Sequence, residues 1–174
     1  KHISGGENMF MPDPNIDAVK PGPVGLNCIG GLLKHLPALT CLGSPTVNSY
    51  RRLWDTGFWA PVYADWGYQN RTCSVRVSAP GRVEYRSVDS THNPYLMGAG
   101  IIKAFEDGLD NKINPGEPEK KNIYDAMKGG KEVDKLPMTL GEAIQRLDTD
   151  EVVKAALPED MLRVFMHYKK DEWE

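Results

Sequence analysis

Alternation of apolar and polar residues predicts a β-hairpin near the middle of the chain. Val75 and Val77 alternate with polar residues on one strand, and Val83 and Tyr85 do so on the next. The connection at 78–81, Ser-Ala-Pro-Gly, has the composition of a tight turn. One face of this hairpin is therefore apolar. The opposite face carries three arginines and one carboxylate: Arg76, Arg82, Arg86 and Glu84.

This charged face has two interpretations. Like charges that lie opposite one another in a sheet destabilise it by about 0.2–1 kcal/mol, and a bound anion would remove that cost. Arginine donates paired hydrogen bonds to phosphate or carboxylate, and a glutamate among arginines can hold Mg²⁺ against phosphate oxygens. The alternative is a solvated strand face whose charges pair with one another. The residue pattern leaves both interpretations open.

Helical spacing of apolar residues predicts helices on both sides of the hairpin. One covers 24–34, with His35 near its end as a capping or surface residue, and a second covers 94–108. Asn93 is the expected N-cap of the second helix and Gly108 its stop. Its apolar side is expected to carry Leu96, Ile101, Ile102 and Phe105.

The remaining segments are shorter. Ser44 and Pro45 predict the start of a short helix that ends near Arg52. We expect a strand at 62–66 and a loop at 110–138, which is either a mobile flap or an oligomer contact. Three further helices are predicted to begin near Thr139, Thr149 and Pro158, the last with Met161, Leu162, Phe165 and Tyr168 as its apolar stripe.

Composition narrows the class of protein. The chain has 174 residues, 40% of them hydrophobic and 26% charged, which is enough for one α+β domain with an antiparallel sheet and helices packed outside it. A net charge of −3 gives no general attraction to nucleic acid or to an anionic membrane. The cysteines, Cys28, Cys41 and Cys73, are odd in number and form no C-x-x-C pair. We interpret them as buried thiols of a cytoplasmic protein.

Several short motifs resemble the glutamine synthetase superfamily, and most closely its γ-glutamylmethylamide synthetase-like branch. They occur in the family's order and at about its spacing. In sequence they are NSYRRL at 48–53, GFWAP at 57–61, QNR at 69–71, RVEYR at 82–86, NPYL at 93–96 and NKINPGE at 111–117.

The resemblance covers nearly the whole chain and implies a glutamine synthetase/guanido kinase-like fold. Residues 1–174 would be the C-terminal part of the catalytic domain, without the N-terminal β-domain and the first part of the catalytic domain. The chain starts at Lys1 without a methionine, which agrees with this expectation. Alone it would be inactive, because most of the family's metal-binding glutamates would be missing.

The resemblance also implies a reaction and partners. Family members join glutamate to ammonia or an amine through a γ-glutamyl phosphate, with ATP as co-substrate and Mg²⁺ or Mn²⁺ as cofactor. They assemble as homo-oligomers of two stacked rings, here expected to be a dodecamer. A non-catalytic fragment is the alternative from another functional class.

The resemblance implies roles for individual arginines. Arg52 would hold the α-carboxylate of glutamate or the transferring phosphate. Arg71 and Arg76 would line the path of the phosphate and neutralise the transition state. Arg82 would lie toward the nucleotide phosphates, and Arg86 would bind the glutamate substrate.

Other roles follow from the same resemblance. Glu84 matches the family's metal-binding glutamate. His2 and Ser4 match the end of an H-x-H-x-S strand near ATP, whose first histidine would fall before Lys1. Tyr124 matches a tyrosine that some bacterial glutamine synthetases have adenylylated, although many members with this tyrosine lack such control.

Trp59 departs from the family pattern. Glutamine-forming members carry a glutamate at this point of G-[YF]-E-A-P, where it attracts ammonium and takes its proton. Tryptophan has no basic group but offers a large apolar face. We therefore expect a pocket for an alkylamine. The alternative is that Trp59 only anchors the loop and that another residue, such as Asp65, supports the use of ammonia.

Overall fold

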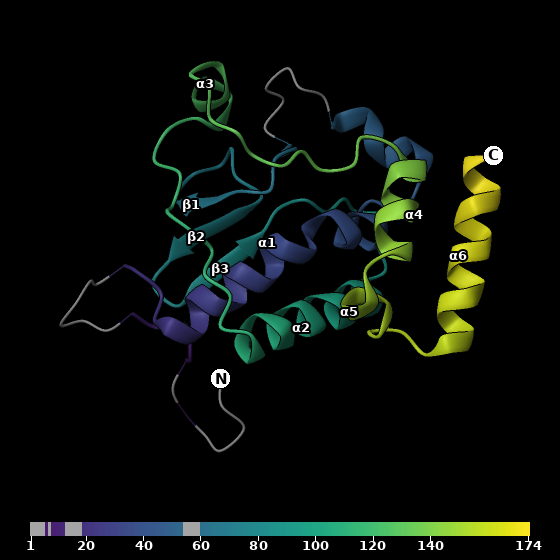
Figure 1. The fold of residues 1–174 in the computed structure, drawn as a ribbon, viewed down its shortest axis with the longest axis horizontal. Helices are drawn as coiled ribbons and strands as arrows, with labels where there is room; N and C mark the ends of the chain where they lie inside the picture. Colours follow the sequence, from purple (N-terminus) through teal and green to yellow (C-terminus); the bar gives the residue numbers. More distant parts are fainter. Residues whose placement is uncertain (1–5, 7, 13–18, 54–59) are drawn as a thin grey trace.

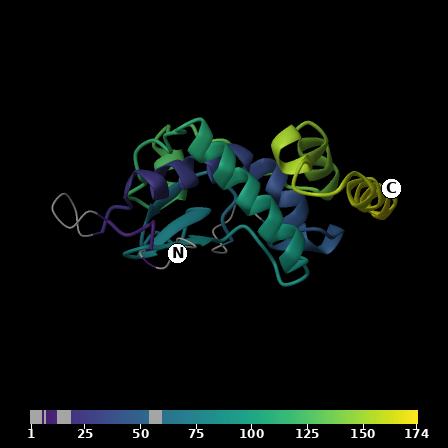
Figure 2. The ribbon, with the colours of Figure 1, turned by 90° about the horizontal axis from the view of Figure 1, so that it is seen from below.

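The computed structural model describes residues 6, 8–12, 19–53 and 60–174. Helix α1 packs side by side with α2 and contacts a small sheet, and α4, α5 and α6 gather at the end of the molecule away from the sheet (Figures 1 and 2). The elements are α1 (Pro23–Gly43), the 3-10 helix η1 (Val47–Arg52), β1 (Trp66–Tyr68), β2 (Val75–Ala79), β3 (Arg82–Tyr85), α2 (Pro94–Asp110), α3 (Ile123–Lys128), α4 (Leu140–Asp148), α5 (Glu151–Lys154) and α6 (Glu159–Trp173).

The predicted hairpin is confirmed. Strands β2 and β3 are antiparallel, with Arg76 opposite Glu84 and an irregularity in register between Val77 and Ala79. The turn needs a glycine, because Gly81 has φ +70° and an added Cβ would lie 2.6 Å from the side-chain nitrogen of Asn8. That nitrogen donates a hydrogen bond to the Gly81 carbonyl at 2.7 Å, so residues near the start of the chain hold the hairpin turn.

Strand β1 corrects the prediction of a purely antiparallel sheet. It begins at Trp66, where the predicted strand was to end, and it runs parallel to β2. The chain turns back at Gln69, which has φ +50°, and starts β2 beside the beginning of β1. The expected strand at 62–66 instead pairs with a later segment: Leu136 N donates to the Val62 carbonyl at 2.8 Å.

Helix α1 continues to Gly43, well beyond its predicted end at residue 34. Pro37 lies inside it without ending it, because the leucines on both sides of the proline are almost completely buried. His35 therefore lies in mid-helix and is 3% exposed, so the prediction of a capping or surface residue is wrong. Neither α1 nor another helix among the described residues combines the length and the apolar character needed to cross a membrane.

Helices α1 and α2 touch through backbone. A Cβ added at Gly31 would lie 2.0 Å from the Ala104 carbonyl oxygen, and one added at Gly108 would lie 2.2 Å from that of Asn27. Gly108 is therefore a packing position inside α2, and not the stop that was predicted. Because α1 also contacts β2, α4 and α5, this contact fixes the position of the central helix among its neighbours.

Other local predictions were partly correct. Asn93 and Thr139 cap α2 and α4 as expected. The 3-10 helix is capped by Thr46 and not by Ser44, because the Thr46 hydroxyl accepts from Ser49 N at 3.2 Å. The predicted loop at 110–138 contains α3. Three residues expected on apolar faces are exposed instead: Ile102, Met161 and Tyr168.

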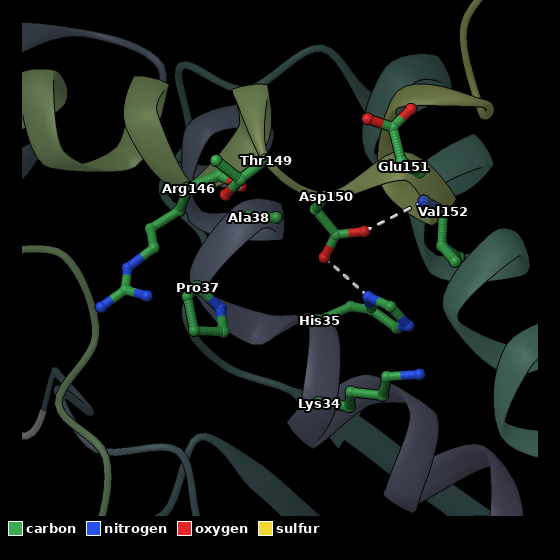
Figure 3. A pocket seen from close by; sticks show the side chains of 9 residues that line it. All are labelled: Lys34, His35, Pro37, Ala38, Arg146, Thr149, Asp150, Glu151 and Val152. Atoms are coloured by element: carbon green, nitrogen blue, oxygen red, sulfur yellow. Dashed lines mark hydrogen bonds and ion pairs between the residues drawn. The ribbon is translucent and has the colours of Figure 1, made fainter.

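An ionic cluster joins three helices around the buried His35, and Figure 3 shows its contact with Asp150. Its Nδ1 lies 2.7 Å from Asp150 Oδ2 at the start of α5, and its Nε2 lies 2.9 Å from Asp107 Oδ2 on α2. Burial alone would lower the pKa of His35, but hydrogen bonds to Asp150 and Asp107 and their charges outweigh it and raise the pKa above 6.5. Both aspartates have lowered pKa values, with burial again opposing the shift.

The glycine contact can be tested with alanine. Gly31→Ala should lower the free energy of unfolding by about 1–3 kcal/mol, because the new Cβ forces two backbones apart. Gly98→Ala is the matched control, since nothing lies within 4 Å of its added Cβ. We expect that control to stabilise the protein by about 0.5–1 kcal/mol. Equal urea midpoints for the two variants would contradict this account.

The His35 cluster predicts a pH dependence of stability. Because the folded-state pKa of His35 is raised, its contribution is fully present below pH 6.5 and is lost as pH rises through the folded value. The loss of stability in His35→Gln relative to the unsubstituted protein should therefore shrink as the pH rises above 6.5 and through the folded-state pKa. His167→Gln is the control, because His167 lies on α6 with its side chain 69% exposed. A pH-independent difference for His35→Gln, measured by urea unfolding, would refute the interpretation.

Candidate active site on the charged face of the hairpin

An ion pair lies at the centre of the charged face. Arg76 Nη1 donates to Glu84 Oε2 at 3.0 Å, as their opposite positions in the ladder require. Its Nη2 donates to Gln69 Oε1 at 2.7 Å. Arg76 is thereby held on both sides and aligned with the strand face, as the alternation of residues predicted.

Arg86 extends this cluster. Its Nε lies 4.0 Å from Glu84 Oε1, and its Nη1 donates to the carbonyl oxygens of Arg71 and Cys73, the latter at 3.3 Å. Burial is the main cause that lowers the pKa of Arg86; the charges of Arg76 and Arg71 add to the shift, and Glu84 opposes it. Arginine nevertheless keeps its charge in proteins. The cluster therefore combines the positive charges of three arginines with one carboxylate.

Several donors on or near this face have no partner among the described residues. Arg71 and Arg82 are exposed, and their side chains make no hydrogen bond or ion pair to the described part of the chain. The Nε atoms of Arg52 and Arg76 are buried without a partner. Such donors favour an anionic ligand, because an unsatisfied buried donor carries a free-energy penalty.

The structure brings together only part of the predicted site. Arg71, Arg76, Glu84 and Arg86 form one cluster. Arg52, at the end of η1, donates instead to the Val88 carbonyl, and no contact joins it or Arg82 to the cluster. His2, Ser4 and Trp59 lie outside the described residues.

The described residues could provide one ligand of a metal site and some of the hydrogen-bond donors of a nucleotide site. Among the described residues there is no group of three or more His, Cys, Asp or Glu side chains that could hold a metal ion. Glu84 is 36% exposed in its side chain, so its carboxylate is open to a further partner. Mg²⁺ is commonly held by one or two carboxylates together with substrate phosphates, and Glu84 suits one such position. Arg71 and Arg82 offer donors that no described residue engages, and these donors suit phosphate oxygens.

Sequence reasoning missed the polar residues that support this site. Asp65 was considered as an amine-binding carboxylate, but its Oδ2 lies 2.7 Å from Lys131 Nζ and its Oδ1 accepts from Trp66 N at 2.8 Å. Both oxygens are therefore already engaged. The partner is 66 positions away in sequence, and no local pattern indicates it.

Comparison with known proteins identifies relatives of this chain. The family of the glutamine synthetase catalytic domain matches residues 2–174. A glutamine synthetase of Pyrococcus furiosus is 42% identical over 183 aligned residues, which cover 99% of this chain and 40% of that protein. A glutamine synthetase of Thermotoga maritima is 38% identical over 178 aligned residues, which cover 95% of this chain and 40% of that protein. The chain thus spans about two fifths of the length of the curated relatives it matches.

Solved structures agree in fold. A structure of GmaS in complex with ADP superposes with a TM-score of 0.87 at 34% identity, over 97% of this chain and 39% of that one. GmaS without ligand gives a TM-score of 0.86 at the same identity. These matches confirm the resemblance found in the motifs. The chain belongs to the glutamine synthetase catalytic-domain family.

Proposed function

We propose that the protein containing this chain is an ATP-dependent ligase that joins glutamate to an amine, and that residues 1–174 are the C-terminal part of its catalytic domain. The observation that carries the proposal is the cluster of Arg71, Arg76, Glu84 and Arg86 on one strand face. Its excess positive charge suits phosphate and carboxylate groups. The family membership of the chain and its structural similarity to GmaS bound to ADP support the same conclusion.

The proposed reaction is the one that the family resemblance implies. A γ-carboxylate oxygen of glutamate attacks the terminal phosphorus of ATP, and ADP leaves. The amine nitrogen then attacks the acyl carbon, phosphate leaves, and the nitrogen loses a proton. Arg71 and Arg76 would neutralise charge on the transferring phosphoryl group, Arg82 would bind the nucleotide phosphates, and Arg52 and Arg86 would orient glutamate.

A divalent metal completes the proposed site. Glu84 would provide one ligand for Mg²⁺ or Mn²⁺, which would supply positive charge next to the phosphates. The remaining ligands would come from the earlier part of the catalytic domain. The relatives also lead us to propose a homo-oligomer of stacked rings, with a dodecamer as the expected size.

The proposed amine is an alkylamine such as methylamine. Trp59 stands where glutamine-forming members carry a glutamate, and two solved structures of similar fold are of GmaS, a γ-glutamylmethylamide synthetase. An apolar ring favours the methyl group over bare ammonium. Glutamine synthesis from ammonia is the second candidate, because the curated relatives are named glutamine synthetase.

The choice of amine can be measured by competition. We expect the full-length protein, given ATP, Mg²⁺ and glutamate, to form γ-glutamylmethylamide in preference to glutamine when methylamine and ammonium are equal in concentration. Mass spectrometry of the products gives the ratio. Trp59→Glu should shift this ratio toward glutamine by about tenfold or more, since one pocket contact is worth about 10–200-fold. Preferential glutamine formation by the unsubstituted protein would favour the second candidate, and no turnover with either amine would favour a non-catalytic role.

The role of Glu84 can be tested separately. Glu84→Gln keeps an oxygen that accepts from Arg76, so folding should be little affected. Loss of the negative charge should lower kcat by about 100-fold or more and weaken Mn²⁺ binding, measured by electron paramagnetic resonance in the presence of ATP. Glu117→Gln is the control, because Glu117 is exposed and makes no ion pair with the described residues. Unchanged Mn²⁺ affinity in Glu84→Gln would remove Glu84 from the metal site.

A further inference from the structure

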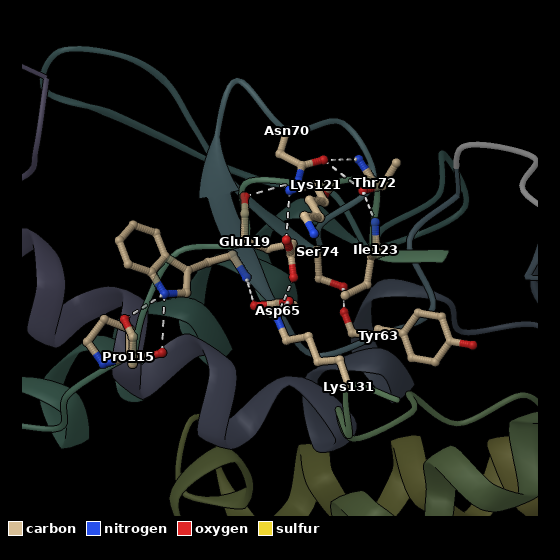
Figure 4. Close-up of polar contacts among 12 residues, drawn as sticks. Tyr63, Asp65, Asn70, Thr72, Ser74, Pro115, Glu119, Lys121, Ile123 and Lys131 are labelled. Atoms are coloured by element: carbon tan, nitrogen blue, oxygen red, sulfur yellow. Dashed lines mark hydrogen bonds and ion pairs between the residues drawn. The ribbon is translucent and has the colours of Figure 1, made fainter. Parts of the chain in front are cut away.

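The loop at 69–74, which carries Arg71, is held by a segment far away in sequence (Figure 4). We call residues 69–74 the arginine loop. Asn70 Nδ2 donates to the carbonyl oxygens of Glu119 and Lys121, at 3.1 and 2.7 Å. Ile123 N donates to the Thr72 hydroxyl at 3.0 Å. The residues on both sides of Arg71 are therefore bonded to the 119–123 segment.

Asn70 also fixes the loop internally. Its Oδ1 accepts from the backbone nitrogen of Thr72 at 3.0 Å and from its hydroxyl at 2.7 Å. Arg71 lies between these two residues, and its carbonyl accepts from Arg86 Nη1. The position of this one loop thus determines where the Arg71 side chain starts and how the Arg86 guanidinium is oriented.

Lys131 links the 119–123 segment to Asp65. Its Nζ lies 2.7 Å from Asp65 Oδ2 and 2.7 Å from Glu119 Oε2. Each of these carboxylate side chains is only 9% exposed, and their other oxygens accept from Trp66 N and Lys121 N, at 2.8 and 2.7 Å. One ammonium group is therefore paired with two buried carboxylates.

The contact of Lys131 with Asp65 and Glu119 depends on the positive charge of the lysine. Burial is the largest single effect on the pKa of Glu119 and would raise it, but the hydrogen bond and charge of Lys131 and the backbone hydrogen bonds from Lys121 and Lys120 together lower the pKa. The pKa of Lys131 is raised by Asp65 and Glu119 although burial opposes it. Without the ammonium group, two carboxylates would remain buried next to one another, and separation of the segments would relieve their repulsion.

We propose that Lys131 is a positioning residue for the ligase reaction: its paired contacts with Asp65 and Glu119 hold the arginine loop, and through it Arg71 and Arg86, in the geometry that phosphoryl transfer needs. This inference rests on the proposed function. Lys131 is not placed to touch substrate itself, because its Nζ faces the two carboxylates. It acts through contacts that run from Glu119 to Asn70 and from there to Arg71.

The decisive experiment compares three variants of the full-length protein. Lys131→Met should lower kcat with saturating ATP, glutamate and amine by about 10–100-fold, since small displacements of catalytic groups have effects of this size. Lys131→Arg should restore kcat to within about threefold, because a guanidinium can also bridge two carboxylates. Lys128→Met, an exposed lysine at the end of α3, is the matched control and should leave kcat unchanged.

A purely structural role would give a different result. In that case Lys131→Met would lower the melting temperature while kcat per folded enzyme stayed within twofold of the unsubstituted protein, and the proposal would be overturned. Should Lys131→Met fail to fold, Glu119→Gln serves in its place, because it keeps the acceptor for Lys121 N while it removes the charge paired with Lys131. We expect the same fall in kcat for this variant.

Hydrogen exchange separates failure of this proposal from failure of the proposed function. Amides of the arginine loop should exchange faster in Lys131→Met than in the unsubstituted protein or in Lys128→Met, whether or not the enzyme turns over either amine. Unchanged exchange in residues 69–74 would overturn the proposal even in an active ligase. Faster exchange in a protein with no ligase activity would overturn the proposed function and with it the catalytic part of this inference.

Discussion

The backbone contact between α1 and α2 is the constraint on which the rest of the structure depends. Gly31 and Gly108 allow the two helices to approach until each lies against a carbonyl of the other, and any side chain there would separate them. Since α1 also packs on β2, α4 and α5, its position sets that of the sheet. The charged face of the hairpin is thus carried by a rigid support, which preorganised electrostatic sites require.

The two interpretations of the charged face are parts of one arrangement. Glu84 pairs with Arg76 at 3.0 Å and lies 4.0 Å from Arg86, so internal ion pairing is present. One carboxylate cannot neutralise the three arginines of this cluster, and the buried Nε of Arg76 has no acceptor among the described residues. The ion pair therefore orients the arginines, while their excess charge and the donors that no described residue engages suit an anionic ligand.

Sequence reasoning succeeded where an interaction spans a few residues. The hairpin and the caps at Asn93 and Thr139 follow from neighbours in the chain, and the motif order was enough to identify the family. It failed where distant segments decide the outcome. The segment at 62–64 pairs with residues near Leu136, and the burial of His35 depends on Asp150, 115 positions away. No periodicity in the sequence encodes such pairings.

The segment that supports the arginine loop also reaches the part of the chain next to the predicted amine pocket. Tyr124, on α3, donates from its hydroxyl to the Ala60 carbonyl at 3.4 Å, and its ring meets that of Tyr63 edge-on at 6.1 Å. Ala60 directly follows Trp59 in sequence. One stretch of chain, 119–131, therefore contacts both the loop that would serve phosphate chemistry and the end of the loop that would select the amine. Because the two contacts lie on a common support, a displacement of 119–131 would disturb the Ala60 backbone as well as the arginine loop.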